Sequence, residues 1–128
     1  MFMSKLAVAE KAMFGETELE RVNPRMWIGK SFDKSTGNVT EISLILLNDG
    51  RIKLIEQILD KNNKSLFYFK SNFNQNAKQI ETEERRGSSD TTDEVRGENM
   101  VGFLKNKEVQ AELTKINKTT LTKSLNHL

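Results

Sequence analysis

The stretch KSLFYFKSNF, from Lys64 to Phe73, places four aromatic side chains and two lysines within ten residues. On a β-strand, successive side chains point to opposite faces of the sheet. One face of this strand would therefore carry Phe67 and Phe69, and the other would carry Tyr68. Because aromatic residues favour strands, the stretch predicts a β-strand with one strongly aromatic face.

This aromatic face has two possible roles. An exposed pair, Phe67 and Phe69, flanked by Lys64 and Lys70, could stack nucleobases as the aromatic side chains of RNA-binding sheets do. In a sheet covered by helices, the same phenylalanines would form the core, because phenylalanine is among the most buried residue types. The second role is favoured, which leaves Tyr68 as the aromatic side chain expected at the surface.

Three further segments upstream of this strand have residue patterns typical of strands. They are MWIGKSF (26–32), VTEISLILL (39–47) and RIKLIEQIL (51–59). The turn Asn48-Asp49-Gly50 predicts a tight hairpin, since Asp-Gly readily adopts positive φ angles. Segment 51–59 also fits a helical stripe, but the preceding hairpin turn favours a strand. Together with 64–73, these segments predict a four-stranded antiparallel meander.

The N-terminal part of the chain has helical signals. Ser4 can cap a helix that runs to about Ala12, and Gly15 supplies a stop for it. A short second helical turn at 17–20 would end before the single proline, Pro24, because the residue before a proline avoids the helical region. We therefore expect the helical start to end at this proline.

The remainder of the chain divides into a polar segment and an apolar one. Residues 81–99 carry a net charge of −4, and segment 74–99 has too few apolar side chains to offset its ordering entropy, which predicts a mobile acidic loop. A C-terminal helix is predicted from an apolar stripe at helical spacing: Met100, Val101, Phe103, Leu104, Val109, Leu113 and Ile116. The expected fold class is α+β: a single domain over residues 1–128 with an N-terminal helix, a four-stranded antiparallel meander and a C-terminal helix.

Composition argues against several classes of chemistry. The chain has no cysteine and its only histidine is His127, so cysteine-based metal sites are excluded and a histidine-centred site is not expected. The spacing of its acidic residues does not match a calcium-binding loop, and no glycine-rich phosphate loop is present. We expect no catalytic residues, no cofactor and no metal. No apolar run approaches the roughly 20 residues of a membrane span, so no membrane contact is expected. Charged residues interrupt the N-terminal stretch 1–16 where a signal peptide would be apolar, so a cytoplasmic protein is predicted.

Four side chains are the expected partner-binding residues: Arg25, Trp27, Lys30 and Tyr68. Tryptophan and arginine are enriched at the energetic centres of protein interfaces, and Arg25, Trp27 and Lys30 lie where the helical start meets the sheet, whereas Tyr68 is the aromatic residue of segment 64–73 that is expected to be exposed. Trp27 has a second and favoured interpretation, in which its ring closes one edge of the core. We expect this junction to contribute more to binding than the acidic loop, which would lose conformational freedom on association.

The N-terminal stretch SKLAVAEKAMFGETELERVNPRMWIGK (4–30) resembles the small RNA polymerase-binding early proteins of T-even bacteriophages, as do the length and composition of the chain. The resemblance implies a protein that binds the RNA polymerase core of the host, in the host cytoplasm, and modulates transcription without catalysis. The alternative is a non-catalytic nucleic-acid-binding protein that uses a basic, aromatic-bearing sheet. The two differ in salt dependence, because phosphate contacts release counterions. Neither reading fixes the oligomeric state.

Overall fold

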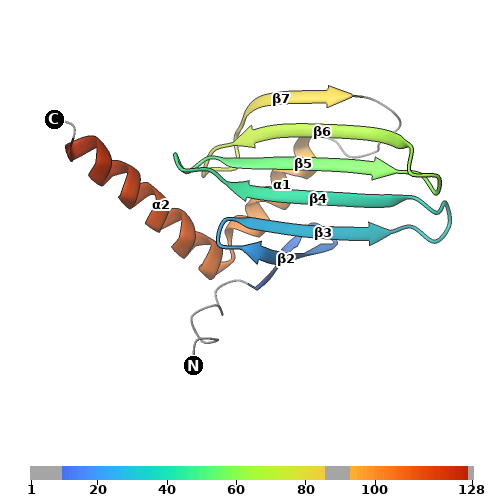
Figure 1. The fold of residues 1–128 in the computed structure, drawn as a ribbon, viewed down its shortest axis with the longest axis horizontal. Coiled ribbons are helices and arrows are strands. Elements are labelled where there is room, and N and C mark those ends of the chain that lie inside the picture. The colour runs from blue at the N-terminus through green and yellow to red at the C-terminus, as the bar shows by residue number, and fades with distance from the viewer. Residues whose placement is uncertain (1–9, 86–92, 127–128) are drawn as a thin grey trace.

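The computed structural model describes residues 10–85 and 93–126, with side chains described over 10–85 and 94–116. Over these residues, seven strands form one antiparallel sheet in which each strand lies beside its neighbours in the sequence (Figure 1). The strands are β1 (Lys11–Phe14), β2 (Thr17–Asn23), β3 (Met26–Phe32), β4 (Val39–Leu46), β5 (Ile52–Leu59), β6 (Ser65–Phe73) and β7 (Gln79–Arg85). Two helices follow, α1 (Asp93–Leu104) and α2 (Lys107–Asn126).

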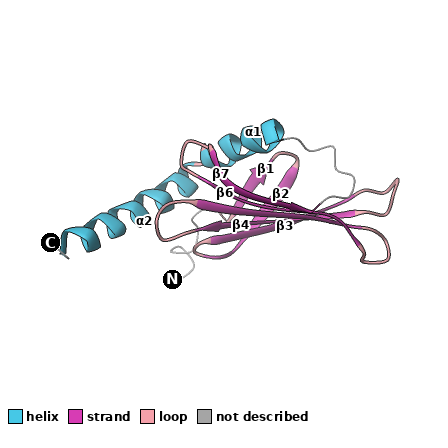
Figure 2. Cartoon of the chain, turned by 90° about the horizontal axis from the view of Figure 1, so that it is seen from above, coloured by secondary structure: helices cyan, strands magenta, loops and turns pink. Residues whose placement is uncertain are grey.

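The two faces of the sheet have different surroundings. Helix α1 lies over one face, α2 extends away from the sheet, and no described helix lies over the other face (Figure 2). The sequence alternates accordingly: Leu44 and Leu54 are buried under the helix layer, whereas Ser43 and Ile55 are half-buried on the opposite side. We call these the covered face and the open face. The period of two along the strands therefore separates core from surface.

The core lies between the covered face and the helices. Trp27 and Phe103 are fully buried, and their rings meet edge to face with centroids 5.3 Å apart and planes at 85°. Arg21 places its guanidinium 5.4 Å from the Trp27 ring centroid and forms an ion pair of 3.0 Å with Glu112, which ties β2 to α2. Aromatic packing of this kind adds to the free energy gained by burying apolar area.

A buried ion pair joins α1 to the middle of the sheet. Arg96 Nε lies 3.1 Å from Glu56 Oε1, with side-chain exposures of 1% and 7% respectively. The same guanidinium lies over the Phe69 ring, 3.8 Å from its centroid, and 5.1 Å from that of Phe67. The phenylalanine pair of the quoted stretch is thus core, as the pattern favoured, and it packs against a cation as well as against apolar groups.

The first hairpin, β1–β2, is part of the sheet, but it passes over β3 at Gly29 and rises out of the plane of the other strands toward α1 (Figure 2). Strand β2 pairs with β1 from Thr17 to Glu20, but its pairing with β3 begins only at Glu20. At the crossing, a Cβ atom on Gly29 would lie 2.4 Å from the Glu18 carbonyl oxygen and 2.6 Å from a methyl carbon of Leu19. Only glycine permits this approach of the two backbones.

The predicted N-terminal helix is wrong. Residues 4–9 lie outside the described part of the chain, and the residues that follow form strand β1, whose side chains alternate between exposed Lys11 and Met13 and buried Ala12 and Phe14. Gly15, expected to stop a helix, has a φ of 63° in the turn between β1 and β2. Local helical spacing was overridden by pairing with β2 and by burial of Phe14.

The four-stranded meander is also wrong, because strands β1, β2 and β7 extend it on both sides. Strand β5 confirms that 51–59 is a strand and not a helix. The acidic segment 74–99 was expected to be a mobile loop, yet it contains β7 and the first half of α1, while 86–92 lies outside the described residues. Strand β7 is an edge strand whose backbone bonds to β6 do not require apolar side chains.

The predicted single C-terminal helix is divided into α1 and α2. Asn106 separates them, and its side-chain Oδ1 accepts hydrogen bonds from the backbone amides of Glu108 (2.9 Å) and Val109 (3.2 Å). This is an N-cap, which satisfies amides at the start of a new helix. Six of the seven residues of the predicted apolar stripe are buried, and Met100, Phe103 and Val109 are fully so, but Val101 is 41% exposed and does not belong to the buried stripe.

Candidate functional site

The open face of the sheet has no described helix over it (Figure 2). Its side chains come from alternate positions of the strands, and nearly all of those on the four central strands are half-buried or exposed. On strands β3 to β6 they are Met26, Ile28, Lys30, Phe32, Val39, Glu41, Ser43, Ile45, Lys53, Ile55, Gln57, Leu59, Leu66, Tyr68, Lys70 and Asn72. The strands that bury the core thus also fix the register of this surface.

Apolar side chains form two groups on the open face. In the middle of the sheet, Ile28 and Ile55 both lie opposite Ser43, and Met26 lies opposite Ile45. Directly opposed side chains on antiparallel strands are close enough to touch. Met26, Ile28, Ile45 and Ile55 therefore form a half-buried apolar patch around Ser43.

The second apolar group lies at the end of the sheet formed by the β3–β4 and β5–β6 turns. Val39 lies opposite Phe32 on one side and Leu59 on the other. Phe32 is 64% exposed, which is unusual for a large apolar side chain on a strand. Contiguous apolar surface of this kind marks interaction sites more often than single exposed residues do.

Charges of both signs surround the apolar groups. Lys30 Nζ lies 3.3 Å from Glu41 Oε2, and Lys70 lies opposite Glu83 in the register of β6 and β7. The Arg85 guanidinium lies 4.2 Å from the Tyr68 ring centroid. Lys30 and Lys70 therefore have carboxylate residues opposite them, whereas Lys53 lies opposite Ile45 and Asn72, and the surface is mixed in charge rather than uniformly basic.

The structure distributes the four predicted partner-binding residues over different environments. Lys30 is exposed and Tyr68 half-buried, and both lie on the open face. Arg25 lies in the β2–β3 turn, where its guanidinium donates a hydrogen bond to Asn48 Oδ1. Trp27 points to the covered face and is fully buried, so its expected role as a contact residue is corrected: its ring is core, the interpretation that the sequence favoured. Sequence reasoning missed the isoleucines of the open face, although alternation along β3, β4 and β5 could have shown them.

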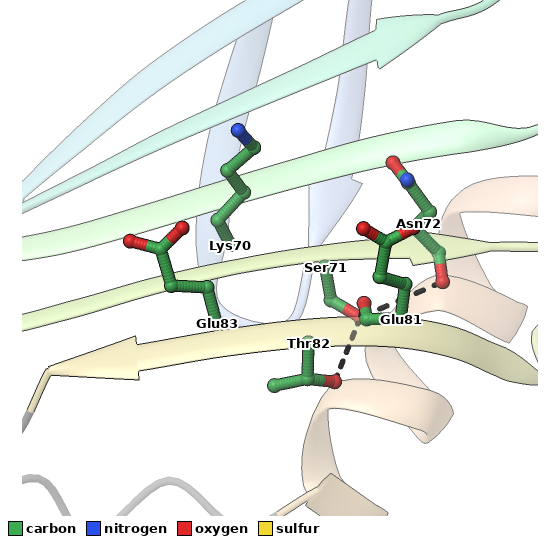
Figure 3. Close-up of a pocket in the computed structure, with 6 residues that line it drawn as sticks. All are labelled: Lys70, Ser71, Asn72, Glu81, Thr82 and Glu83. Atoms are coloured by element: carbon green, nitrogen blue, oxygen red, sulfur yellow. Dashed lines mark hydrogen bonds between the residues drawn. The ribbon is translucent and has the colours of Figure 1, made fainter.

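A small hollow lies where β6 and β7 pair, and Figure 3 shows its six labelled residues. Lys70, Asn72, Glu81 and Glu83 belong to the open face, whereas the Ser71 hydroxyl donates to the Glu81 carbonyl oxygen at 2.6 Å and lies 3.2 Å from Thr82 Oγ1. The cavity measures about 70 Å³, which is far below the several hundred Å³ of a site for an organic ligand. Its hydroxyl contacts fasten the edge strand to the sheet.

Two turn aspartates have lowered pKa values with local causes. The Ser35 hydroxyl and amide, which donate to Asp33 at 2.6 and 2.9 Å, lower the pKa of that carboxyl below its ordinary value. The amide of Arg51, 3.0 Å from Asp49 Oδ1, and its guanidinium lower the pKa of Asp49. Both shifts result from the turn geometry, because each carboxylate accepts a hydrogen bond from the backbone amide two residues further along the chain.

These shifts predict a pH dependence. A carboxyl whose pKa is lower in the folded state stabilises the fold above its unfolded pKa, and that contribution is lost as the pH falls through the folded pKa. We expect side-chain carboxyl titrations by NMR to place the pKa values of Asp33 and Asp49 below the ordinary value of an aspartate side chain. Ordinary pKa values for both aspartates would contradict the turn geometry.

Two absences apply to the described residues, 10–85 and 93–126. No group of three acidic or histidine side chains is placed to hold a metal ion within that part of the chain. No helix there is long and apolar enough to cross a membrane. No family model, no curated protein and no solved structure matches this chain, so its function has to be inferred from its own surfaces.

Proposed function

We propose that this chain is a non-catalytic binding module whose open face docks onto another protein. The observation that supports this proposal is the half-buried apolar patch Met26, Ile28, Ile45 and Ile55 on a face without a described helix. Protein interfaces combine an apolar centre with a polar and charged rim. The ion pair of Lys30 with Glu41 and the Arg85–Tyr68 contact supply such a rim.

A protein partner fits the open face better than a nucleic acid does. The aromatic pair that could have stacked bases, Phe67 and Phe69, is buried under α1. On the open face, Glu41 lies beside Lys30 and Glu83 lies opposite Lys70, so a phosphate backbone would meet carboxylates at each of these cations. Like charges brought together at an interface oppose binding.

The partner to test first is bacterial RNA polymerase core, because stretch 4–30 resembles polymerase-binding phage proteins. Purified polymerase core should retain the chain at about 200 mM salt, where contacts made only to phosphates are strongly weakened. A short DNA duplex and a single-stranded RNA, tested under the same conditions, should show no mobility shift. Strong retardation of either nucleic acid without retention on polymerase would reverse the ranking of the two functions.

Substitution of Ile55 by aspartate should weaken polymerase binding at least tenfold, because it places a charge in the middle of the apolar patch. The matched control is Ile80→Asp, which adds the same charge at a 52%-exposed isoleucine on edge strand β7. Affinities are measured by biolayer interferometry, with circular dichroism to show that both variants are folded. Equal affinity for the two folded variants would place the contact surface elsewhere.

A further inference from the structure

A second hollow lies on the covered face, between the start of α1 and the β1–β2 hairpin. It has a volume of about 470 Å³, within the range of small-molecule sites. Its apolar walls include Phe14 and Ile42. Its polar groups come from the β1–β2 turn, from strands β2 to β5 and from helix α1. The polar residues are Glu16, Thr17, Ser31, Thr40, Glu56 and Asn99.

The hollow exists because of the way the first hairpin crosses the sheet. Gly29 lets the β2 backbone pass close to β3, so the β1–β2 turn rises beside α1. There Asn99 packs against Gly15, where an added Cβ would lie 2.8 Å from Asn99 Nδ2. The Thr17 and Ser31 hydroxyls form a hydrogen bond of 2.7 Å across β2 and β3. The walls are thus held by specific contacts on several sides.

The lining of this hollow carries a net negative charge from Glu16, because the Glu56 carboxylate is already paired with Arg96 at 3.1 Å. Among the described residues, the charged side chains that line it are Glu16, which is exposed, and Glu56, which is buried. Arg96 binds Glu56 at Oε1 but does not itself line the hollow, because its guanidinium lies against the Phe69 ring.

We infer that this hollow binds a small aliphatic amine. An ammonium group has three donors and no acceptor, which matches a wall of carboxylates, hydroxyl oxygens and an amide carbonyl. The alkyl portion would lie against Phe14 and Ile42. A second ammonium would be favoured near Glu16 at the exposed side of the hollow, so a diamine should bind more tightly than a monoamine. This site is independent of the open face, since it lies on the opposite side of the sheet.

The test uses the full-length chain and 1,4-diaminobutane as the probe, with butylamine and 1,4-butanediol as comparisons. In a ¹H–¹⁵N NMR titration, we expect saturable shifts at the amides of Ser31, Thr40 and Asn99 with the diamine, weaker binding of butylamine and none of the diol. Absence of saturation in the millimolar range, or equal shifts with the diol, would overturn the inference. So would shifts spread evenly over exposed acidic residues, because they would indicate counterion binding only.

Variants assign the binding to the hollow. Thr40→Val retains a β-branched side chain but removes a hydroxyl, and it should weaken diamine binding roughly threefold to tenfold, the effect of one hydrogen bond. Ser43→Ala is the control, because Ser43 lies on the same strand but on the open face. Glu16→Gln should also weaken the diamine while leaving butylamine nearly unchanged. Unchanged diamine affinity in both Thr40→Val and Glu16→Gln would exclude this site.

Discussion

Replacing Trp27 with alanine should lower the free energy of unfolding by about 3–5 kcal/mol, the range for truncating a large buried aromatic side chain. The ring is fully buried, meets Phe103 edge to face and lies beneath the Arg21 guanidinium, so its loss would leave a cavity between the sheet and both helices. Urea denaturation followed by circular dichroism measures the change. Because a domain of this size has a net stability of only about 5–15 kcal/mol, the variant should be close to unfolding at 37 °C.

Tyr68→Ala is the matched control, because Tyr68 is an aromatic residue on a central strand whose side chain lies on the open face. We expect it to cost much less, since less area is lost from the core and no cavity forms. If Trp27→Ala is as stable as Tyr68→Ala, the placement of Trp27 in the core is wrong. The alternative interpretation, in which Trp27 is a partner-binding residue at the surface, would then be favoured.

Breaking the Glu56–Arg96 pair should have an effect of similar size. Arg96→Leu leaves the Glu56 carboxylate buried at 5% exposure without its cation, and removal of one partner from a buried pair costs about 3–5 kcal/mol. The double variant Glu56→Leu/Arg96→Leu removes both charges together. We expect it to recover much of the stability, because apolar side chains of similar volume can replace a buried ion pair at little cost.

A double-mutant cycle measures this coupling directly by urea denaturation of the wild type, both single variants and the double variant. Additive effects would contradict the account, because they would mean that the two side chains do not stabilise each other. Glu41→Leu/Lys30→Leu provides a surface comparison, since that pair is more exposed, and exposed pairs contribute only about 0–1 kcal/mol.

The sequence was most informative where the side-chain pattern and the turn chemistry agreed. In 64–73, alternation placed Phe67 and Phe69 on one face and Tyr68 on the other, and the structure has them so. The Asp-Gly turn at 49–50 correctly joined two strands, since Gly50 has a φ of 86°. Both signals depend only on residues that are close together in the sequence. They agree with the fold because the alternation and the turn fix which side chains face the core.

The failures came where distant parts of the chain determine the structure. Segment 79–85 has one apolar residue, Ile80, and forms a strand because β6 offers an unpaired edge. Helix α1 has no clear apolar stripe in its first half, where it buries Arg96 against an aromatic pair and a glutamate forty residues earlier. Spacing within α1 could not reveal Glu56 as that partner, since the contact exists only after the sheet has formed.

The candidate site shows the same division. Lys30 and Tyr68 could be placed on the surface from local pattern, but the apolar patch requires the register of three strands, β3, β4 and β5. The acidic hollow depends on the crossing of β2 over Gly29, which a single glycine in a strand hints at but does not specify. Interaction surfaces built across several strands are therefore visible only after the fold is known.

The most direct test of the open-face proposal is a methyl cross-saturation measurement on deuterated, isoleucine-labelled protein with protonated bacterial RNA polymerase core. Ile28, Ile45 and Ile55 lie on the open face, whereas Ile42 and Ile52 lie in the core, so one residue type reports on both sides of the sheet. We predict strong attenuation of the three open-face methyl signals and little change in the two core signals. Attenuation confined to other methyl groups, or none at saturating polymerase, would contradict the proposal.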